Sequence, residues 1–171
     1  MSDLEAAGLT PAEPLAAHHV VDSFECGKAP LDQFLQRFAL VNQKTGSART
    51  YVVCRSRRVV GYYSLVVGSV EHARAPVRIG KGLPRHPIPV MLLARLAVHL
   101  REQGRGLGRA LLKDALSRTD RAADIAGIRA LLVHAKDDEA RAWYESHDFE
   151  PSPVDPYHLF LLMKDLRAVL R

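Results

Sequence analysis

The first part of the chain carries one helical and three extended hydrophobic patterns. Apolar residues at helical spacing run from 31 to 41, with Pro30 in the first turn and Gly46 after the last. The β-rich segments 50–54 and 59–70 flank a polar turn, which is typical of a hairpin. Residues 15–24 are expected to form a short strand that runs into a turn. The pattern therefore predicts antiparallel structure early in the chain.

The second half of the chain predicts a strand, a glycine turn and a helix in succession. Residues 90–98 are almost continuously apolar, as in a central strand covered on both faces. Glycines follow, and from Leu107 the apolar positions have helical spacing. The remaining segments are expected as a loop at 71–89, a strand at 128–133, a helix at 137–146, a strand at 157–163 and a helix at 165–170. The order is that of a mixed α and β protein.

Length and composition predict one globular domain over residues 1–171. The chain has 171 residues, of which 47% are hydrophobic and 25% charged. No apolar run approaches the roughly 18 residues of a membrane span, and the acidic N-terminus is unlike a signal peptide. Cys26 and Cys54 form no CxxC pair, so we expect a reducing compartment, a cytoplasmic protein and no metal site.

The basic residues gather in one part of the chain. The net charge is +5, yet residues 31–90 hold ten basic against two acidic side chains. Residues 1–30 hold one basic residue against five acidic ones. A concentration of this kind is either a solvated surface or a footprint for phosphates.

The glycine turn after residue 98 is a candidate anion site. Backbone N–H groups at a helix N-terminus lack internal partners, and the helix dipole favours negative charge there. Gly106 and Gly108 would let the backbone approach a pyrophosphate without a Cβ in the way. Arg101, Arg105 and Arg109 add positive charge beside them.

The spacing of the glycines distinguishes between three known nucleotide-binding loop motifs. A Walker A loop is excluded because no Lys-Ser/Thr follows Gly108, and a Rossmann fingerprint is excluded because the third glycine is out of register. The coenzyme A pyrophosphate loop, [QR]xxGx[GA], matches residues 103–108 completely. A connection without any ligand stays the alternative.

In these motifs the sequence resembles the GNAT-type N-acetyltransferases over nearly its whole length. The segment from Ala142 to Pro151 is similar to the A-x-x-[FW]-Y-x-x-x-G-F element of that family, with Asp148 in place of the usual glycine. Asp tolerates a left-handed backbone better than most residues, so we expect the helix exit to be preserved. The resemblance implies a mixed, mostly antiparallel sheet of 6–7 strands, about four flanking helices and splayed central strands.

The resemblance narrows to the GNAT toxins of type II toxin–antitoxin systems. The matching stretches are Phe24–Leu35 with Gln43, Arg49–Val53, Pro87–Val98 and Glu150–Pro153. Such toxins acetylate the α-amine of aminoacyl-tRNA and stop translation. The resemblance thus implies aminoacyl-tRNA as substrate, a ribbon-helix-helix antitoxin encoded nearby, operator DNA bound only through the antitoxin complex, a homodimer, and no membrane association.

The resemblance also implies the site residues. Acetyl-CoA would be held by the end of the central strand and the glycine loop, comprising Leu96, Ala97, Val98, Gln103, Gly104, Arg105, Gly106, Leu107, Gly108 and Arg109. The amide of Val98 would polarise the thioester carbonyl. Tyr144 matches the family's catalytic tyrosine, and a phenol of pKa about 10 can protonate a departing thiolate.

The sequence offers no evident general base. Glu71 and His72 lie near the expected active face, but nothing fixes their geometry. An α-amine has a pKa of about 7.7–8.0, against about 10.4 for lysine, so part of it is already neutral and water can accept its proton. The candidate tRNA contacts are Arg37, Lys44, Arg49, Arg74, Arg78, Lys81, Arg85 and Arg95. Arg95 interrupts an apolar strand and is either paired inside or exposed to the cleft.

Two other functions stay open on the sequence. One is a GNAT acetyltransferase that acts on a small-molecule amine or a protein. The other is a non-catalytic subunit that binds CoA or assembles a repressor, against which Tyr144 and the intact loop argue.

Overall fold

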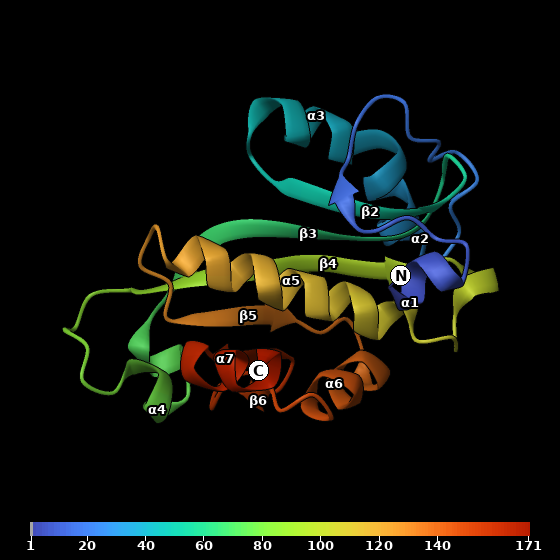
Figure 1. Cartoon of the computed structure of the whole chain (residues 1–171). Coiled ribbons are helices and arrows are strands. Elements are labelled where there is room, and N and C mark those ends of the chain that lie inside the picture. Colours follow the sequence, from blue (N-terminus) through green and yellow to red (C-terminus); the bar gives the residue numbers. More distant parts are fainter. Residues whose placement is uncertain (1) are drawn as a thin grey trace. The chain divides into compact units, whose positions relative to one another are not determined.

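The structure, a computed structural model, describes residues 2–171 (Figure 1). In chain order its first elements are α1 (Asp3–Ala6), β1 (Glu13–Pro14), α2 (Ala29–Gln33), the π-helix η1 (Phe34–Phe38), α3 (Ala39–Thr45), β2 (Arg49–Arg55) and β3 (Arg58–Val70). They continue with η2 (His72–Arg74), α4 (Val77–Gly80), β4 (Ile88–Val98), η3 (Leu100–Glu102), α5 (Leu107–Ala123), β5 (Ala130–His134), α6 (Asp138–Glu145), β6 (Glu150–Pro151), β7 (His158–Leu162) and α7 (Met163–Leu170).

The strands form one seven-stranded sheet in the order β1-β2-β3-β4-β5-β7-β6. β4 and β5 pair in parallel, whereas β1 with β2, β2 with β3, β5 with β7 and β6 with β7 pair antiparallel. The parallel register runs from Val90↔Ala130 to Leu93↔Val133, although β4 continues to Val98. The sheet confirms the mixed, mostly antiparallel architecture expected from the sequence.

The chain divides into two compact units, and β3, β4 and α5 each continue from one unit into the other. Unit 1 comprises residues up to Val66 together with Arg95–Ala115, and unit 2 comprises Val67–Ala94 and Leu116–Arg171. The expectation of a single domain over 1–171 stays a prediction.

The core of unit 1 lies between the β2–β3 hairpin and the helical segment 29–45. Pro30 stands in the first turn of α2, and Gly46 ends α3 with a left-handed φ of 77°, as predicted. Phe34, Leu35 and Tyr62 are buried there, and the Tyr62 hydroxyl donates to the Leu31 carbonyl at 2.7 Å. Burial of these apolar side chains is the main favourable contribution to folding.

Unit 2 is built on the antiparallel pair β5 and β7. The first four residues of β5 are buried, and two of them, Ala130 and Leu132, pack in a cluster with Ile79, Ile88 and Phe160. Arg129, just before β5, donates from Nε to the Ile79 carbonyl at 2.7 Å and from a terminal nitrogen to the Lys81 carbonyl at 3.2 Å. These two bonds fasten the 79–81 segment to the start of the strand.

The predicted strand at 15–24 is wrong. Within it the structure has only an isolated bridge between Val20 and Arg58, and a two-residue strand, β1, precedes it. The reason is a local turn, because the buried His19 accepts the Ala16 N–H at Nδ1 (2.9 Å). A side chain that takes a backbone donor competes with strand pairing.

Two further segments differ from the expected pattern. The predicted helix between Pro30 and Gly46 contains a π-helical turn at Phe34–Phe38, and the predicted loop at 71–89 contains η2 and α4. No helix among the described residues is long and apolar enough to cross a membrane.

Candidate functional site

The glycine loop has the backbone shape that only glycine adopts easily. Gly104 and Gly106 have φ values of 77° and 86°, in the left-handed region. A Cβ at either position would meet no atom within 4 Å, so open space adjoins the loop. Glycine is required here by backbone conformation, and the open side leaves room for a ligand to approach the main chain.

Gln103 holds the loop to the end of β4. Its amide nitrogen donates to the carbonyls of Val98 at 2.9 Å and Cys26 at 3.0 Å. The side chain predicted to touch the cofactor is therefore hydrogen-bonded within the chain, although Gln103 is exposed. It fixes where the loop starts.

The first turns of α5 lie very close to β3. A Cβ on Gly61 would come within 3.0 Å of Leu111 Cδ1 and 3.1 Å of Leu107 Cδ2. One turn further on, the Tyr63 hydroxyl donates to the Asp114 carboxylate. These contacts fix the N-terminus of α5, whose first N–H groups have no carbonyl of a preceding turn to bond.

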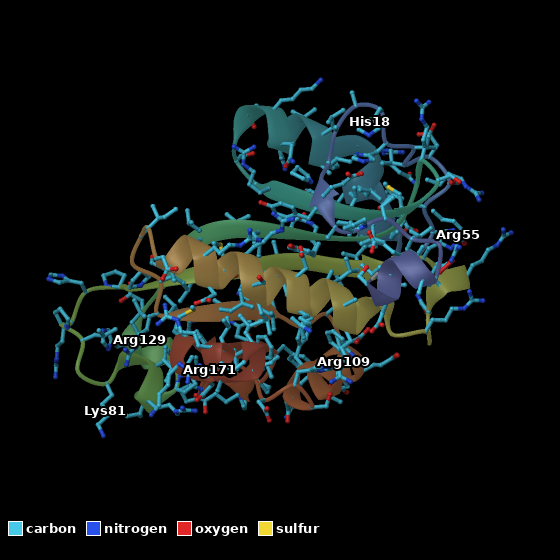
Figure 2. All side chains as sticks on the ribbon, in the orientation of Figure 1. His18, Arg55, Lys81, Arg109, Arg129 and Arg171 are labelled. Carbon is cyan, nitrogen blue, oxygen red and sulfur yellow. The ribbon has the colours of Figure 1, made fainter. Side chains whose placement is uncertain are left out.

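Several arginines lie near the loop in the sequence or in space, but not all of them are free to bind an anion. Arg101, Arg105 and Arg109 are exposed (Arg109 is labelled in Figure 2). Arg55 makes a two-pronged pair with the buried Glu102, at 3.1 Å and 3.2 Å. The charge of Arg55 is thereby balanced, and the three exposed arginines supply the field for an anion.

Tyr144 lies on α6 in unit 2 and is 8% exposed. Its ring packs edge-on against Trp143 at 5.0 Å and Phe149 at 5.4 Å between centroids. Burial raises the pKa of its hydroxyl above the ordinary 10. The phenol therefore keeps its proton at physiological pH and can serve as a donor.

The helix exit after Tyr144 confirms the expectation for Asp148. Asp148 adopts φ 69°, the left-handed conformation that glycine usually provides. Asp137 caps the other end of α6 by accepting the Ala140 N–H at 2.8 Å. Both ends of the helix that carries Tyr144 are thus fixed by local sequence.

Four predicted tRNA contacts belong to unit 1. Arg37, Lys44 and Arg49 are exposed on η1, α3 and β2. Arg95 instead stacks on an aromatic ring, with its guanidinium carbon 3.6 Å from the centroid of Phe34. Arg95 is thus paired within unit 1 by a cation–π contact.

The other contacts named from the sequence, Arg74, Arg78, Lys81 and Arg85, belong to unit 2 and are exposed. Arg78 pairs with Asp165 at 2.8 Å and Glu150 at 3.6 Å, whereas Lys81 stands at the surface (Figure 2). Arg78 is therefore a weaker candidate for phosphate than Lys81 and Arg85, since two carboxylates already neutralise it.

Neither Glu71 nor His72, the two residues considered as a general base, has surroundings that mark it as one. His72 Nε2 lies 2.9 Å from the Pro84 carbonyl, and its ring fills the space beside Gly80, where a Cβ would come within 2.6 Å of Nδ1. His72 thus holds the 72–84 segment together. The Glu71 carboxylate is exposed.

The sequence did not single out a stacked histidine pair in unit 2. His134 and His158 are opposite each other in the β5–β7 register, with ring centroids 3.9 Å apart and planes inclined by 13°. His158 Nε2 also lies 3.4 Å from Asp155. No motif marks these residues, because only the strand register brings them together.

One group of metal-ligating residue types exists among residues 2–171, namely Glu13, His19 and Cys54. His19 Nδ1 accepts the Ala16 N–H, so its proton sits on Nε2 and points to Glu13 at 2.8 Å. Burial raises the pKa of the Cys54 thiol to about 11. In this structure Glu13 and His19 thus form a hydrogen-bonded pair beside a protonated thiol.

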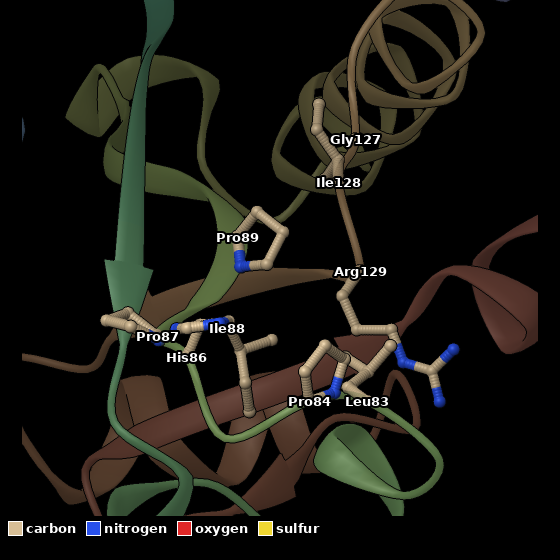
Figure 3. A pocket seen from close by; sticks show the side chains of 9 residues that line it. All are labelled: Leu83, Pro84, His86, Pro87, Ile88, Pro89, Gly127, Ile128 and Arg129. Carbon is tan, nitrogen blue, oxygen red and sulfur yellow. The ribbon is translucent and has the colours of Figure 1, made fainter.

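A mainly apolar pocket of about 360 Å³ opens in unit 2 (Figure 3). It lies at the amino ends of β4 and β5 and is lined by Leu83, Pro84, His86, Pro87, Ile88, Pro89, Gly127, Ile128 and Arg129. None of the residues predicted to bind acetyl-CoA or to act in catalysis lines it.

Comparison of the sequence with known families identifies its class. A family model for the acetyltransferase (GNAT) domain matches residues 46–151. A tRNA-acetylating toxin of Mycobacterium tuberculosis (strain ATCC 25618 / H37Rv) is 55% identical over 150 residues, covering 88% of this chain and 90% of that protein.

Solved structures of toxins are similar along almost the whole chain. AtaT complexed with acetyl-methionyl-tRNAfMet has a TM-score of 0.88 at 30% identity and covers 95% of this chain and 99% of its own. A tyrosine-to-phenylalanine mutant of AtaT, bound to the C-terminus of the antitoxin AtaR and to acetyl-CoA, gives 0.82 at 28% identity, covering 95% and 98%. The AtaT–AtaR complex bound to DNA gives 0.78 at 26%, covering 95% and 100%.

Proposed function

Because the chain belongs to the GNAT acetyltransferase family, an acetyl-CoA-dependent class of enzyme, we propose that it is a toxin that acetylates the α-amine of aminoacyl-tRNA and so blocks translation. The observation that carries this proposal is its 55% identity to a tRNA-acetylating toxin across 88% of the chain. The similarity to a toxin in complex with acetyl-methionyl-tRNAfMet supports the same acceptor.

Acetyl-CoA binds, in this proposal, through main-chain groups. The amides at the start of α5 and in the Gly104–Gly106 turn hold the pyrophosphate, with Arg105 and Arg109 beside it. Gln103 contributes by fixing the loop to the carbonyls of Val98 and Cys26. The strand end Leu96–Val98 pairs with the pantetheine amides, and the Val98 N–H polarises the thioester carbonyl.

Acetyl transfer then proceeds directly from thioester to amine. The neutral amine nitrogen attacks the carbonyl carbon, the C–N bond forms and the C–S bond breaks as the tetrahedral intermediate collapses. Tyr144 gives its hydroxyl proton to the departing sulfur, so the leaving group is a thiol. The extra proton of the amine passes to water and restores the phenol. A thioester is an activated acyl donor, so the proposed step uses no metal ion.

The raised pKa of Tyr144 determines when its proton can move to the leaving sulfur. A free thiol has a pKa of about 8.5, well below that of a buried phenol. Full transfer of the proton to a free thiolate is therefore uphill. Tyr144 acts while the C–S bond is breaking, when the sulfur gains charge next to the donated hydrogen bond.

Aminoacyl-tRNA is held through its phosphates. Arg37, Lys44, Arg49, Lys81 and Arg85 are exposed cations that suit sequence-independent, salt-dependent contacts. Arg95 and Arg78, which have partners of their own, contribute less. The net charge of +5 favours encounter with a polyanion.

The proposed partners follow the related toxins. A structure of AtaT with the C-terminus of the antitoxin AtaR and one of AtaT–AtaR with DNA support an antitoxin that covers this toxin and links it to operator DNA. We propose that this antitoxin is of the ribbon-helix-helix type, that the free toxin is a homodimer, and that it acts in the cytoplasm, where charged tRNA is found.

The acceptor is tested by competition between amine classes. Purified protein is incubated with labelled acetyl-CoA and either charged total tRNA, the same tRNA after deacylation, or lysine and polyamines. Label on charged tRNA alone supports the proposal. Label on the free amines with none on charged tRNA would establish the alternative, an acetyltransferase for small amines.

A further inference from the structure

The stacked histidines at the ends of β5 and β7 form a flat surface that the proposed chemistry does not use. His134 and His158 face each other across the antiparallel register, and their rings stack at 3.9 Å and 13°. The carboxylate of Asp155 lies 3.4 Å from Nε2 of His158, whose side chain is 26% exposed. His134 is exposed, so part of its side chain is accessible to a ligand.

The electrostatics keep the His134 ring uncharged. The pKa of His134 is lowered by partial burial and by His158 and Arg74, while Asp155 acts in the opposite direction. His134 is therefore neutral at physiological pH, and a neutral imidazole presents an aromatic face rather than a cation. Arg74, which acts electrostatically on His134, is exposed and forms no ion pair within residues 2–171.

The arrangement does not suit a metal ion. Lone pairs on two parallel rings lie in two parallel planes and cannot converge on one ion. Aromatic stacking next to a cation is instead the combination with which proteins bind unpaired nucleotides, where the base lies on the ring and the phosphate meets the cation.

The position on the chain fits the acceptor. His134 ends β5, and residues 135–137 lead directly into α6, the helix that carries Tyr144. Both histidines, Arg74 and Tyr144 belong to the same unit. The 3′ end of a charged tRNA is single-stranded, and its bases are free to stack.

We propose that His134, backed by His158, is a stacking platform for a nucleobase at the 3′ end of the acceptor tRNA, and that Arg74 contacts the adjoining phosphate. This inference rests on the proposed function and deepens it. The histidines are positioning residues that set the affinity for RNA and take no part in proton transfer.

The test measures binding of a fluorescent RNA minihelix that ends in single-stranded CCA. His134→Ala is expected to weaken binding by about 5- to 150-fold, which is the usual loss of one base–aromatic stack. His134→Phe keeps a flat ring and is expected to bind like the wild type. His18→Ala is the control, because His18 is also exposed and its ring also lies against a histidine, His19, in unit 1, at 4.1 Å between centroids and a tilt of 39°.

A steady-state assay with charged tRNA supplies the second readout. His134→Ala is expected to raise KM for aminoacyl-tRNA and to leave KM for acetyl-CoA and kcat near the wild-type values. The platform is contradicted if the wild type does not bind the minihelix, or if His134→Ala binds it as well as His18→Ala does. It is also contradicted if His134→Phe loses as much as His134→Ala, because the ring nitrogens would then be needed.

Failure of the platform and failure of the proposed function are distinguishable. Wild-type protein that acetylates charged tRNA with no loss in His134→Ala keeps the function and rejects the platform. Wild-type protein that binds the minihelix through His134 yet transfers no acetyl group to charged tRNA keeps the platform and rejects the acceptor.

Discussion

The guanidinium of Arg95 lies 3.6 Å from the centre of the Phe34 ring, and so it joins β4 to the π-helix η1 within unit 1. A double-mutant cycle with Arg95→Met and Phe34→Leu should give a coupling of about 0.5–2 kcal/mol in the free energy of unfolding. Methionine keeps most of the apolar stem and removes the charge. Chemical denaturation of the four proteins measures the coupling, and strictly additive effects would show that the contact contributes nothing.

The glycine loop should be sensitive to one added methyl group. Gly106→Ala places a Cβ on a backbone with φ 86°, which costs about 1–2 kcal/mol although no atom blocks it. The loop will relax to another shape, and we expect affinity for acetyl-CoA, measured by calorimetry, to fall at least about fivefold. Gly127→Ala is the control, because its Cβ also meets nothing within 4 Å and its φ is not left-handed. Equal affinities in the two variants would contradict a backbone role for the loop.

The Arg55–Glu102 pair should stabilise unit 1. Glu102→Gln keeps the shape and removes the charge that faces the guanidinium of Arg55. Because Glu102 is buried but Arg55 is 36% exposed, the expected loss is modest, about 1–3 kcal/mol in the free energy of unfolding. Glu25→Gln, an exposed carboxylate, should change stability by less than about 0.5 kcal/mol. Urea unfolding separates the two variants.

Stability should depend on pH through His134. Its pKa is lowered in the folded protein, so on acidification the unfolded chain takes up this proton first, near pH 6.5, and the folded state loses stability as the pH falls below that value. His134→Gln removes this titration. The free energy of unfolding of the wild type should therefore fall more than that of the variant between pH 7.5 and pH 5. An identical fall in both proteins would contradict the lowered pKa.

The glycine loop and the exit of α6 were predictable because local backbone requirements fix them. The spacing of residues 103–108 gave the loop, and the left-handed tendency of aspartate anticipated Asp148 at φ 69°. The hairpin followed from two β-rich segments around a polar turn, and the buried central strand followed from a continuous run of apolar residues. Such features depend on neighbours in the sequence.

The features that sequence reasoning missed depend on partners far away in the chain. The π-helical turn at Phe34–Phe38 leaves no mark in the spacing of apolar residues. The bond from the Gln103 amide to the carbonyl of Cys26, 77 residues away, could not be read from the loop motif, and the predicted contact of Gln103 with the cofactor stays a prediction. The stack of His134 on His158 exists only because the register of β5 and β7 sets them opposite each other.

Tyr144 is central to the account, and its test is a single substitution. Tyr144→Phe keeps the ring that packs on Trp143 and Phe149 and removes only the hydroxyl, so folding and acetyl-CoA binding should be preserved. General acid catalysis typically contributes about 10²- to 10⁴-fold, so transfer from acetyl-CoA should slow by that range.

The decisive measurement is the rate at which labelled acetyl moves from acetyl-CoA to charged total tRNA in wild type and Tyr144→Phe under single-turnover conditions. The account predicts labelled aminoacyl-tRNA with the wild type and a rate at least about 10²-fold lower with the variant. Equal rates in the two proteins, with acetyl-CoA bound equally well by both, would contradict it.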